Sequence, residues 1–137
     1  MHRRIAMTLI ILGLVASGTF AQAAEEHPLR AGAATADITP QQWPVELIGS
    51  FSKRLAGHAW DRLNARAVVL DNVETRLAFV TVDSCLVPRT LFDEAKRRAA
   101  ELCGMPADHI LTAATHTHSA PRVKNGRNVE APAHYVE

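Results

Sequence analysis

Residues 110–121 read Ile-Leu-Thr-Ala-Ala-Thr-His-Thr-His-Ser-Ala-Pro, an apolar run that ends in two histidines. The run predicts a short β-strand, in which side chains two residues apart point to the same face. We therefore expect His116 and His118 to project together from the carboxyl end of this strand. Pro121 is expected to stop the strand ladder because it has no N–H to donate.

Two imidazoles on one side of a strand end are a natural start for a metal site. Neutral imidazole binds Zn²⁺ at about 2.0–2.1 Å, and a catalytic zinc has about three protein ligands and one open position. A pair of solvated loop histidines is the alternative interpretation. The pattern His-x-His alone leaves both interpretations open.

The residues before this strand predict a βαβ unit. Residues 76–82 form a nearly continuous apolar run, which is typical of a strand covered on both faces. Thr90 to Cys103 carries apolar residues at helical spacing, and Gly104 is expected just beyond the helix end. Asp83 follows the first strand, so we expect it at the same sheet edge as the histidines, where ligands bind in open α/β sheets. A turn or N-cap aspartate is the alternative.

Two further strands are predicted upstream. Residues 63–70 and 76–82 resemble a hairpin joined by residues 71–75, and residues 31–39 read as a first strand. The fold class is therefore α/β, a mixed sheet with a hairpin and a βαβ unit. The polar loop that precedes the hairpin holds His58, a third candidate ligand or substrate-contact group unless it is simply solvated.

The first 23 residues have the pattern of a secretory signal peptide. Arg3 and Arg4 precede an apolar stretch from Ile5 to Val15, and Ala-Gln-Ala at 21–23 fits a cleavage site. The stretch is shorter than the roughly 20 apolar residues that a membrane span needs. We expect a secreted or periplasmic protein without a transmembrane span in the mature chain.

Composition narrows the class of partner. The chain has 137 residues, 47% of them hydrophobic and 21% charged, as in a single globular domain. Of its 15 basic residues, Arg3 and Arg4 leave with the leader, so 13 basic residues face 14 acidic ones and the net charge is −1. This balance argues against a nucleic-acid partner. Cys85 and Cys103 remain in the exported part, where the sequence allows either a disulfide or two small buried side chains.

The end of the sequence reads as the opening of a helix, over residues 131–137. A helix of one or two turns is marginal on its own. We therefore expect residues 24–137 to be the N-terminal part of a larger catalytic domain, in the form of a fragment or a truncated product.

Four motifs, in this order, resemble the N-terminal part of the neutral/alkaline ceramidase family over about residues 31–137. They are Asp-Ile-Thr-Pro at 37–40, Gly57-His58 leading into Asn-Ala-Arg-Ala at 64–67, Val-Asp-Ser-Cys at 82–85, and Thr-His-Thr-His-Ser-Ala-Pro at 115–121. The resemblance implies a zinc-dependent amidase that hydrolyses the N-acyl bond of ceramide and releases fatty acid and sphingosine.

The resemblance also implies roles for individual residues. His116 is a ligand of one zinc ion, and His118 lies beside the metal and helps to stabilise the tetrahedral intermediate. His58 matches a family histidine near the site, and Asp83 is a candidate for orienting a histidine. In the family a further histidine, a glutamate, a tyrosine and a catalytic serine come from far downstream. The resemblance therefore implies that residues 1–137 alone are inactive.

Two other functions stay open at the level of the sequence. Metallohydrolases of the amidohydrolase type also carry His-x-His at a strand end, but there the motif closes the first strand of a barrel. In this chain it follows at least three predicted strands and a helix. The other alternative is a secreted, non-catalytic binding domain whose histidines are structural or solvated.

Overall fold

The computed structural model describes residues 27–123 together with Ala131 and Tyr135. The predicted signal peptide and most of the predicted C-terminal helix lie outside the described residues. The elements are β1 (Arg30–Asp37), β2 (Val45–Glu46), β3 (Leu55–Ala56), β4 (Asn64–Asp71), β5 (Arg76–Val82), α1 (Arg89–Cys103), a 3-10 turn (Ala107–His109) and β6 (Ile110–Ala114).

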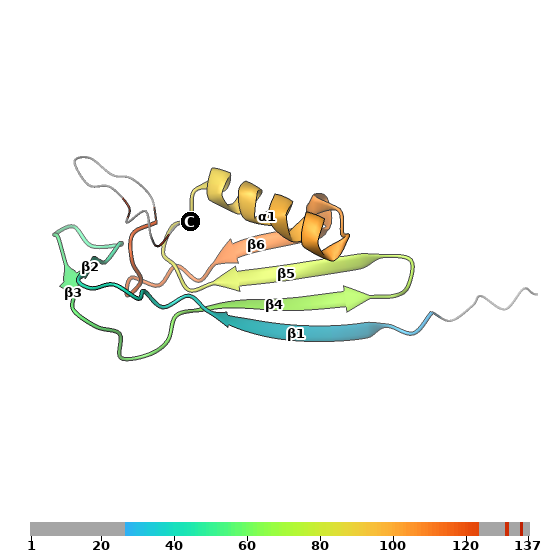
Figure 1. Cartoon of the computed structure of the whole chain (residues 1–137), viewed down its shortest axis with the longest axis horizontal. Coiled ribbons are helices and arrows are strands. Elements are labelled where there is room, and N and C mark those ends of the chain that lie inside the picture. Colours follow the sequence, from blue (N-terminus) through green and yellow to red (C-terminus); the bar gives the residue numbers. More distant parts are fainter. Residues whose placement is uncertain (1–26, 124–130, 132–134, 136–137) are drawn as a thin grey trace, which may run out of the picture.

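A four-stranded mixed sheet forms the body of the molecule, in the order β1-β4-β5-β6. β1, β4 and β5 are antiparallel neighbours, and β6 lies parallel to β5. The connection between these parallel strands is α1, which lies against one face of the sheet (Figure 1). The predicted α/β class, with its hairpin and βαβ unit, is confirmed.

The hairpin turn between β4 and β5 is built by two short polar side chains. The Asp71 carboxylate accepts a hydrogen bond from the Val73 N–H at 2.7 Å, and the Asn72 side-chain oxygen accepts one from the Thr75 N–H at 2.7 Å. Such side chains replace backbone partners in turns. The hairpin predicted from the sequence therefore closes where these side chains occur.

The core lies between the sheet and α1. Ala78, Met105 and Ile110 are buried there, with Val69, Val80, Ala99 and Ala100 packed around them. On the opposite face Phe79 is 42% exposed and Leu111 is 57% exposed. Within the described residues, the prediction that residues 76–82 are covered on both faces therefore holds for one face.

α1 ends as the sequence predicts. Gly104 adopts a left-handed conformation with φ of 60°, and its N–H donates to the Ala100 carbonyl oxygen. Glycine is favoured there because it has no Cβ to strain this backbone. The helix begins one residue before the predicted start, after Pro88.

The prediction that the last strand reaches the histidines is wrong. β6 ends at Ala114, and His116 has a left-handed φ of 63°, so alternation of side chains along a strand does not apply to this pair. The prediction for Pro121 is also wrong in its detail, because this residue forms an isolated antiparallel bridge with Leu47. The segment after β6 therefore pairs with the loop that precedes β3.

The two cysteines are free thiols, Cys85 buried and Cys103 exposed. A disulfide is therefore not formed, and the buried interpretation holds for Cys85 alone. In the part of the chain that the structure describes, no helix combines the length and apolar character needed to cross a membrane.

Candidate functional site

The candidate site begins where β5 and β6 end. Val82 pairs with Ala114 across the parallel strands, and the Val82 carbonyl oxygen accepts the N–H groups of Ser84 at 2.9 Å and Thr115 at 3.0 Å. One carbonyl thus ties the two segments that leave the sheet. The residues that follow, Cys85 in one segment and His116 in the other, are thereby brought together.

Cys85, His116 and His118 form a cluster whose potential ligand atoms all lie within 4.8 Å of one another. The Cys85 Sγ lies 3.8 Å from the His116 Nε2, and the two imidazole centroids are 5.2 Å apart with their planes inclined at 52°. Cys85 is 3% exposed, whereas both histidines are exposed. The cluster therefore has a buried sulfur side and an open imidazole side.

Two of these donors, the Cys85 thiol and the His116 imidazole, fit a zinc ion in chemistry and spacing. Zinc takes cysteine sulfur at about 2.3 Å and imidazole nitrogen at about 2.0–2.1 Å in tetrahedral sites, which places sulfur and nitrogen about 3.5 Å apart. The Cys85 to His116 distance of 3.8 Å is close to that value. Cys85 belongs to the Val-Asp-Ser-Cys motif but was not predicted as a ligand from the sequence; it follows Asp83 by two residues in the segment after β5.

A second chain segment fixes the loop that carries the histidines. The Ile48 N–H donates to the Ala120 carbonyl oxygen at 3.2 Å, and the Arg122 N–H donates to the Glu46 carbonyl oxygen at 2.9 Å. The side chains of Arg122 and Glu46 also form an ion pair at 3.0 Å, with only 22% and 13% of their surfaces exposed. The segments 46–48 and 120–122 therefore act as one short antiparallel ladder.

Asp83 lies at the predicted sheet edge, with its main partners on β4 and a further side-chain hydrogen bond to Thr115. Its carboxylate accepts hydrogen bonds from the Arg66 guanidinium and from the Asn64 N–H, each at 2.9 Å. The hydrogen bond from Arg66 holds the pKa of Asp83 below its ordinary value of 3.8, assisted by the Asn64 N–H and opposed by partial burial. These contacts tie the carboxylate to the strands, so its role in orienting a histidine stays a prediction.

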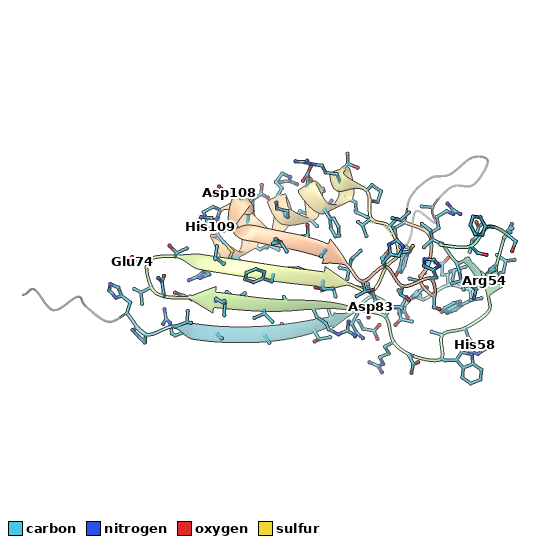
Figure 2. All side chains as sticks on the ribbon, turned by 180° about the vertical axis from the view of Figure 1, so that it is seen from behind. Arg54, His58, Glu74, Asp83, Asp108 and His109 are labelled. Carbon is cyan, nitrogen blue, oxygen red and sulfur yellow. The ribbon has the colours of Figure 1, made fainter. Side chains whose placement is uncertain are left out.

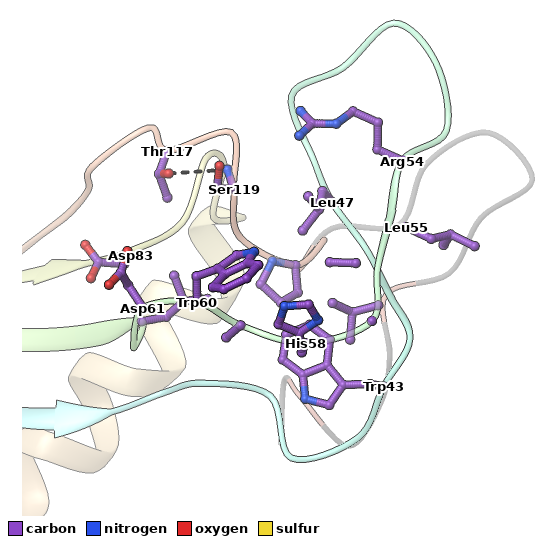
Figure 3. Close-up of a pocket in the computed structure, with 16 residues that line it drawn as sticks. Trp43, Leu47, Arg54, Leu55, His58, Trp60, Asp61, Asp83, Thr117 and Ser119 are labelled. Atoms are coloured by element: carbon purple, nitrogen blue, oxygen red, sulfur yellow. Dashed lines mark hydrogen bonds between the residues drawn. The ribbon is translucent and has the colours of Figure 1, made fainter.

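His58 lines a cavity of about 660 Å³, to whose lining Cys85, His116 and His118 do not contribute. Its ring contacts the Trp60 indole edge to face, with centroids 4.9 Å apart. Asp83, Thr117 and Ser119 line the same cavity, and Figure 3 shows Thr117 and Ser119 across the cavity from His58. The histidine loop thus contributes Thr117 and Ser119 to this cavity, while His116 and His118 gather with Cys85.

All these groups lie at one end of the molecule. Figure 2 shows His58 and Asp83 beyond the same end of the sheet, with His109 and Glu74 at the opposite end. The His109 Nδ1 lies at hydrogen-bond distance, 2.9 Å, from the Arg76 carbonyl oxygen of β5. His109 therefore contacts the sheet and not the site. His109 is therefore a natural control residue for the site histidines.

Tyr135 approaches this end of the sheet from the C-terminal part of the chain. Burial, together with the charge of Asp83, raises the pKa of its phenol to about 12. The group therefore stays protonated at neutral pH. It lines an apolar pocket together with Phe92 of α1 and Val82 of β5. His134 lies outside the described residues.

The structure is similar to that of neutral ceramidase from Pseudomonas aeruginosa, with a TM-score of 0.63 and 28% sequence identity. This match covers 72% of the chain. The chain resembles a neutral ceramidase. A second structure, a ceramidase complexed with C2, gives a TM-score of 0.60 and 31% identity over 69% of the chain. The resemblance inferred from the sequence motifs is confirmed.

The ceramidase-like chain spans 16% of the length of the chain in each of these two structures. No family model matches the chain. The similarity therefore concerns the fold of a part of these structures.

Proposed function

We propose that this chain is the N-terminal part of an exported, zinc-dependent amidase that hydrolyses the N-acyl bond of ceramide or of a related lipid amide. The observation that carries the proposal is the grouping of Cys85, His116 and His118 at the carboxyl edge of β5 and β6. The similarity to two ceramidase structures supports the substrate class. Export is inferred from the pattern of residues 1–23.

His116 and Cys85 are the residues that would hold the zinc ion from this chain. A bound zinc ion polarises an amide carbonyl and lowers the pKa of bound water to about 7. Because the Cys85 thiol is buried beneath the exposed imidazoles, the open side of the cluster is the side of His116 and His118. A substrate therefore approaches from the histidine side.

His118 is proposed to stabilise the charge that develops on the carbonyl oxygen. A preorganised N–H donor is effective there when it needs no rearrangement during the reaction. The ring of His118 is already set against that of His116 at 5.2 Å. The cavity beside the cluster offers Trp43, Leu47 and Trp60 as apolar surface for a lipid-like amide.

The cluster supplies at most three donors, so we expect this chain to bind zinc measurably but more weakly than a complete four-ligand site. We also propose that hydrolysis needs residues in addition to 1–137, because the chain spans 16% of the ceramidases that it resembles. A reading frame that continues past residue 137 with further histidine, glutamate and tyrosine is the cheapest supporting observation.

The test combines metal analysis with an assay of N-acyl bond hydrolysis on the protein as the cell produces it. We expect bound zinc, activity that a chelator removes and Zn²⁺ restores, and loss of both in His116→Ala. His109→Ala is the matched control and should retain zinc. Undiminished activity in His116→Ala contradicts the proposal.

A folded protein that holds no zinc would instead favour the secreted, non-catalytic binding domain. The amidohydrolase alternative is disfavoured by the order of elements. The histidine motif follows β6, after β1, β4, β5 and α1, rather than the first strand of a barrel.

A further inference from the structure

The loop before β3 approaches the candidate metal cluster at Gly49. This glycine has a left-handed φ of 92°, and a Cβ built on it would lie 2.5 Å from Cγ, 2.7 Å from Cδ2 and 2.8 Å from Nδ1 of His118. Non-bonded contacts of a Cβ are essentially never that short, so the imidazole occupies the space that the Cβ of any other residue would need. The His118 ring can therefore keep this position only if residue 49 has no Cβ.

The backbone on both sides of this contact is tied down, so it has little freedom to move apart. Ile48, next to Gly49, is bonded to Ala120, two residues after His118, and Arg122 bonds to Glu46 through backbone and side chain. Ile48 is 5% exposed and Ala120 is fully buried. The clash of a side chain at position 49 would therefore be relieved by rotation of the His118 ring rather than by separation of the two segments.

We propose that Gly49 is a positioning residue for His118, because its missing Cβ leaves free the space that the imidazole occupies beside His116. The contact of Gly49 with the ring stands on the geometry alone. Its consequence for zinc and for the reaction rests on the function proposed above. The two parts are tested by different readouts, so failure of one is distinguishable from failure of the other.

The structure offers two matched controls for Gly49→Ala. Gly104 also has a left-handed backbone, with φ of 60°, but a Cβ there would meet nothing within 4 Å, so Gly104→Ala introduces backbone strain without crowding. Gly57 lies in the neighbouring loop, and a Cβ there would also meet nothing within 4 Å. Gly57→Ala therefore reports the effect of an added methyl group in open space.

The first measurement is proton NMR of the metal-free chain. We expect nuclear Overhauser effects between the Gly49 Hα and His118 ring protons, and between the two imidazoles. In Gly49→Ala the contacts between the imidazoles should disappear, while Gly104→Ala and Gly57→Ala should retain them. Absence of the Gly49 to His118 contact in the wild-type chain overturns the proposal, whatever the chain's affinity for zinc.

The second measurement is the affinity for Zn²⁺ by calorimetry. Gly49→Ala should weaken binding by about tenfold, because the displaced His118 ring no longer supports the neighbouring ligand His116, and both controls should leave it unchanged. In a His118→Ala background, Gly49→Ala should cause no further loss, because the crowded ring is gone. An equal loss in Gly104→Ala, or a further loss in the double variant, overturns the proposal. If Gly49→Ala alone fails to fold, recovery of folding in the double variant supports crowding, and continued failure overturns it.

Discussion

The four-stranded sheet and the loops beyond its carboxyl edge are stabilised in different ways. In the sheet, each residue of β4 meets a partner on β1 or β5 in regular register, and apolar side chains fill the space beneath α1. In the loops, the geometry depends on single features. These are the left-handed φ of His116, the missing Cβ of Gly49 and the Glu46–Arg122 ion pair. The difference teaches that stability of this fold and placement of its site depend on separate residues.

The largest expected effect is on the sheet. Ile110 is 5% exposed and lies in the core beneath α1, so Ile110→Ala should lower the free energy of unfolding by about 2–5 kcal/mol. The neighbouring Leu111 points to the open face and is 57% exposed, so Leu111→Ala should change stability by no more than about 0.5 kcal/mol. Urea unfolding of the two variants measures the contrast. Equal losses would mean that both faces of β6 are covered.

The next largest effect is on zinc binding at the site, with the stability of the sheet unchanged. His116→Ala should weaken zinc binding by about 100-fold, because it removes a ligand rather than a supporting group. The His116 ring is exposed, so the midpoint of thermal unfolding of the metal-free chain should not change. Calorimetry and a melting curve on the same sample measure both quantities. A marked fall in the melting midpoint would show that the histidine loop also supports the sheet.

The Glu46–Arg122 pair joins two segments of the loop region, since it holds the histidine loop against the segment before Gly49. Glu46→Gln should lower the free energy of unfolding by about 1–3 kcal/mol, because it leaves a mostly buried guanidinium without its charged partner. It should also weaken zinc binding. Glu101→Gln is the control, because the Glu101–Arg97 pair on α1 is exposed and should contribute no more than about 0.5 kcal/mol. A stability loss without any change in zinc affinity would separate this ladder from the site.

The smallest effect concerns pH and Asp83. Its pKa is lower in the folded protein than the ordinary 3.8, so the folded state favours the ionised carboxylate. That stabilisation is present above the unfolded pKa and is lost as pH falls through the lower, folded value. Asp83→Asn should therefore flatten the dependence of stability on pH below about pH 4, and Arg66→Gln should do the same. A slope unchanged in both variants would contradict this assignment.

Much of the sheet was predictable because its signals are local and periodic. The predicted strand at residues 76–82 matches β5, the predicted 63–70 differs from β4 by one residue at each end, and the helix differs at its start by one. Apolar runs, a polar turn and a terminal glycine are read directly from neighbouring residues. The mixed sheet with its parallel βαβ unit follows from the order of these signals.

The site was predicted in part. The grouping of the two histidines was predicted, but the reason given for it, their alternation along a strand, is wrong. His116 and His118 do lie together, but a left-handed residue and a contact with a distant loop place them there, rather than the alternation of a strand. Cys85 and Gly49 were missed because no period in the sequence links positions so far apart. A glycine in a loop has many explanations until its neighbour is known. The roles of His58 and Asp83 stay predictions.

The central claim is that the loops beyond β5 and β6 assemble a zinc site around His116. X-ray absorption at the zinc edge of the zinc-loaded chain tests this claim most directly. We predict imidazole nitrogen at about 2.0–2.1 Å, together with sulfur at about 2.3 Å from Cys85, and loss of imidazole scattering in His116→Ala. A shell made only of oxygen, or an imidazole signal unchanged in His116→Ala, would contradict the account.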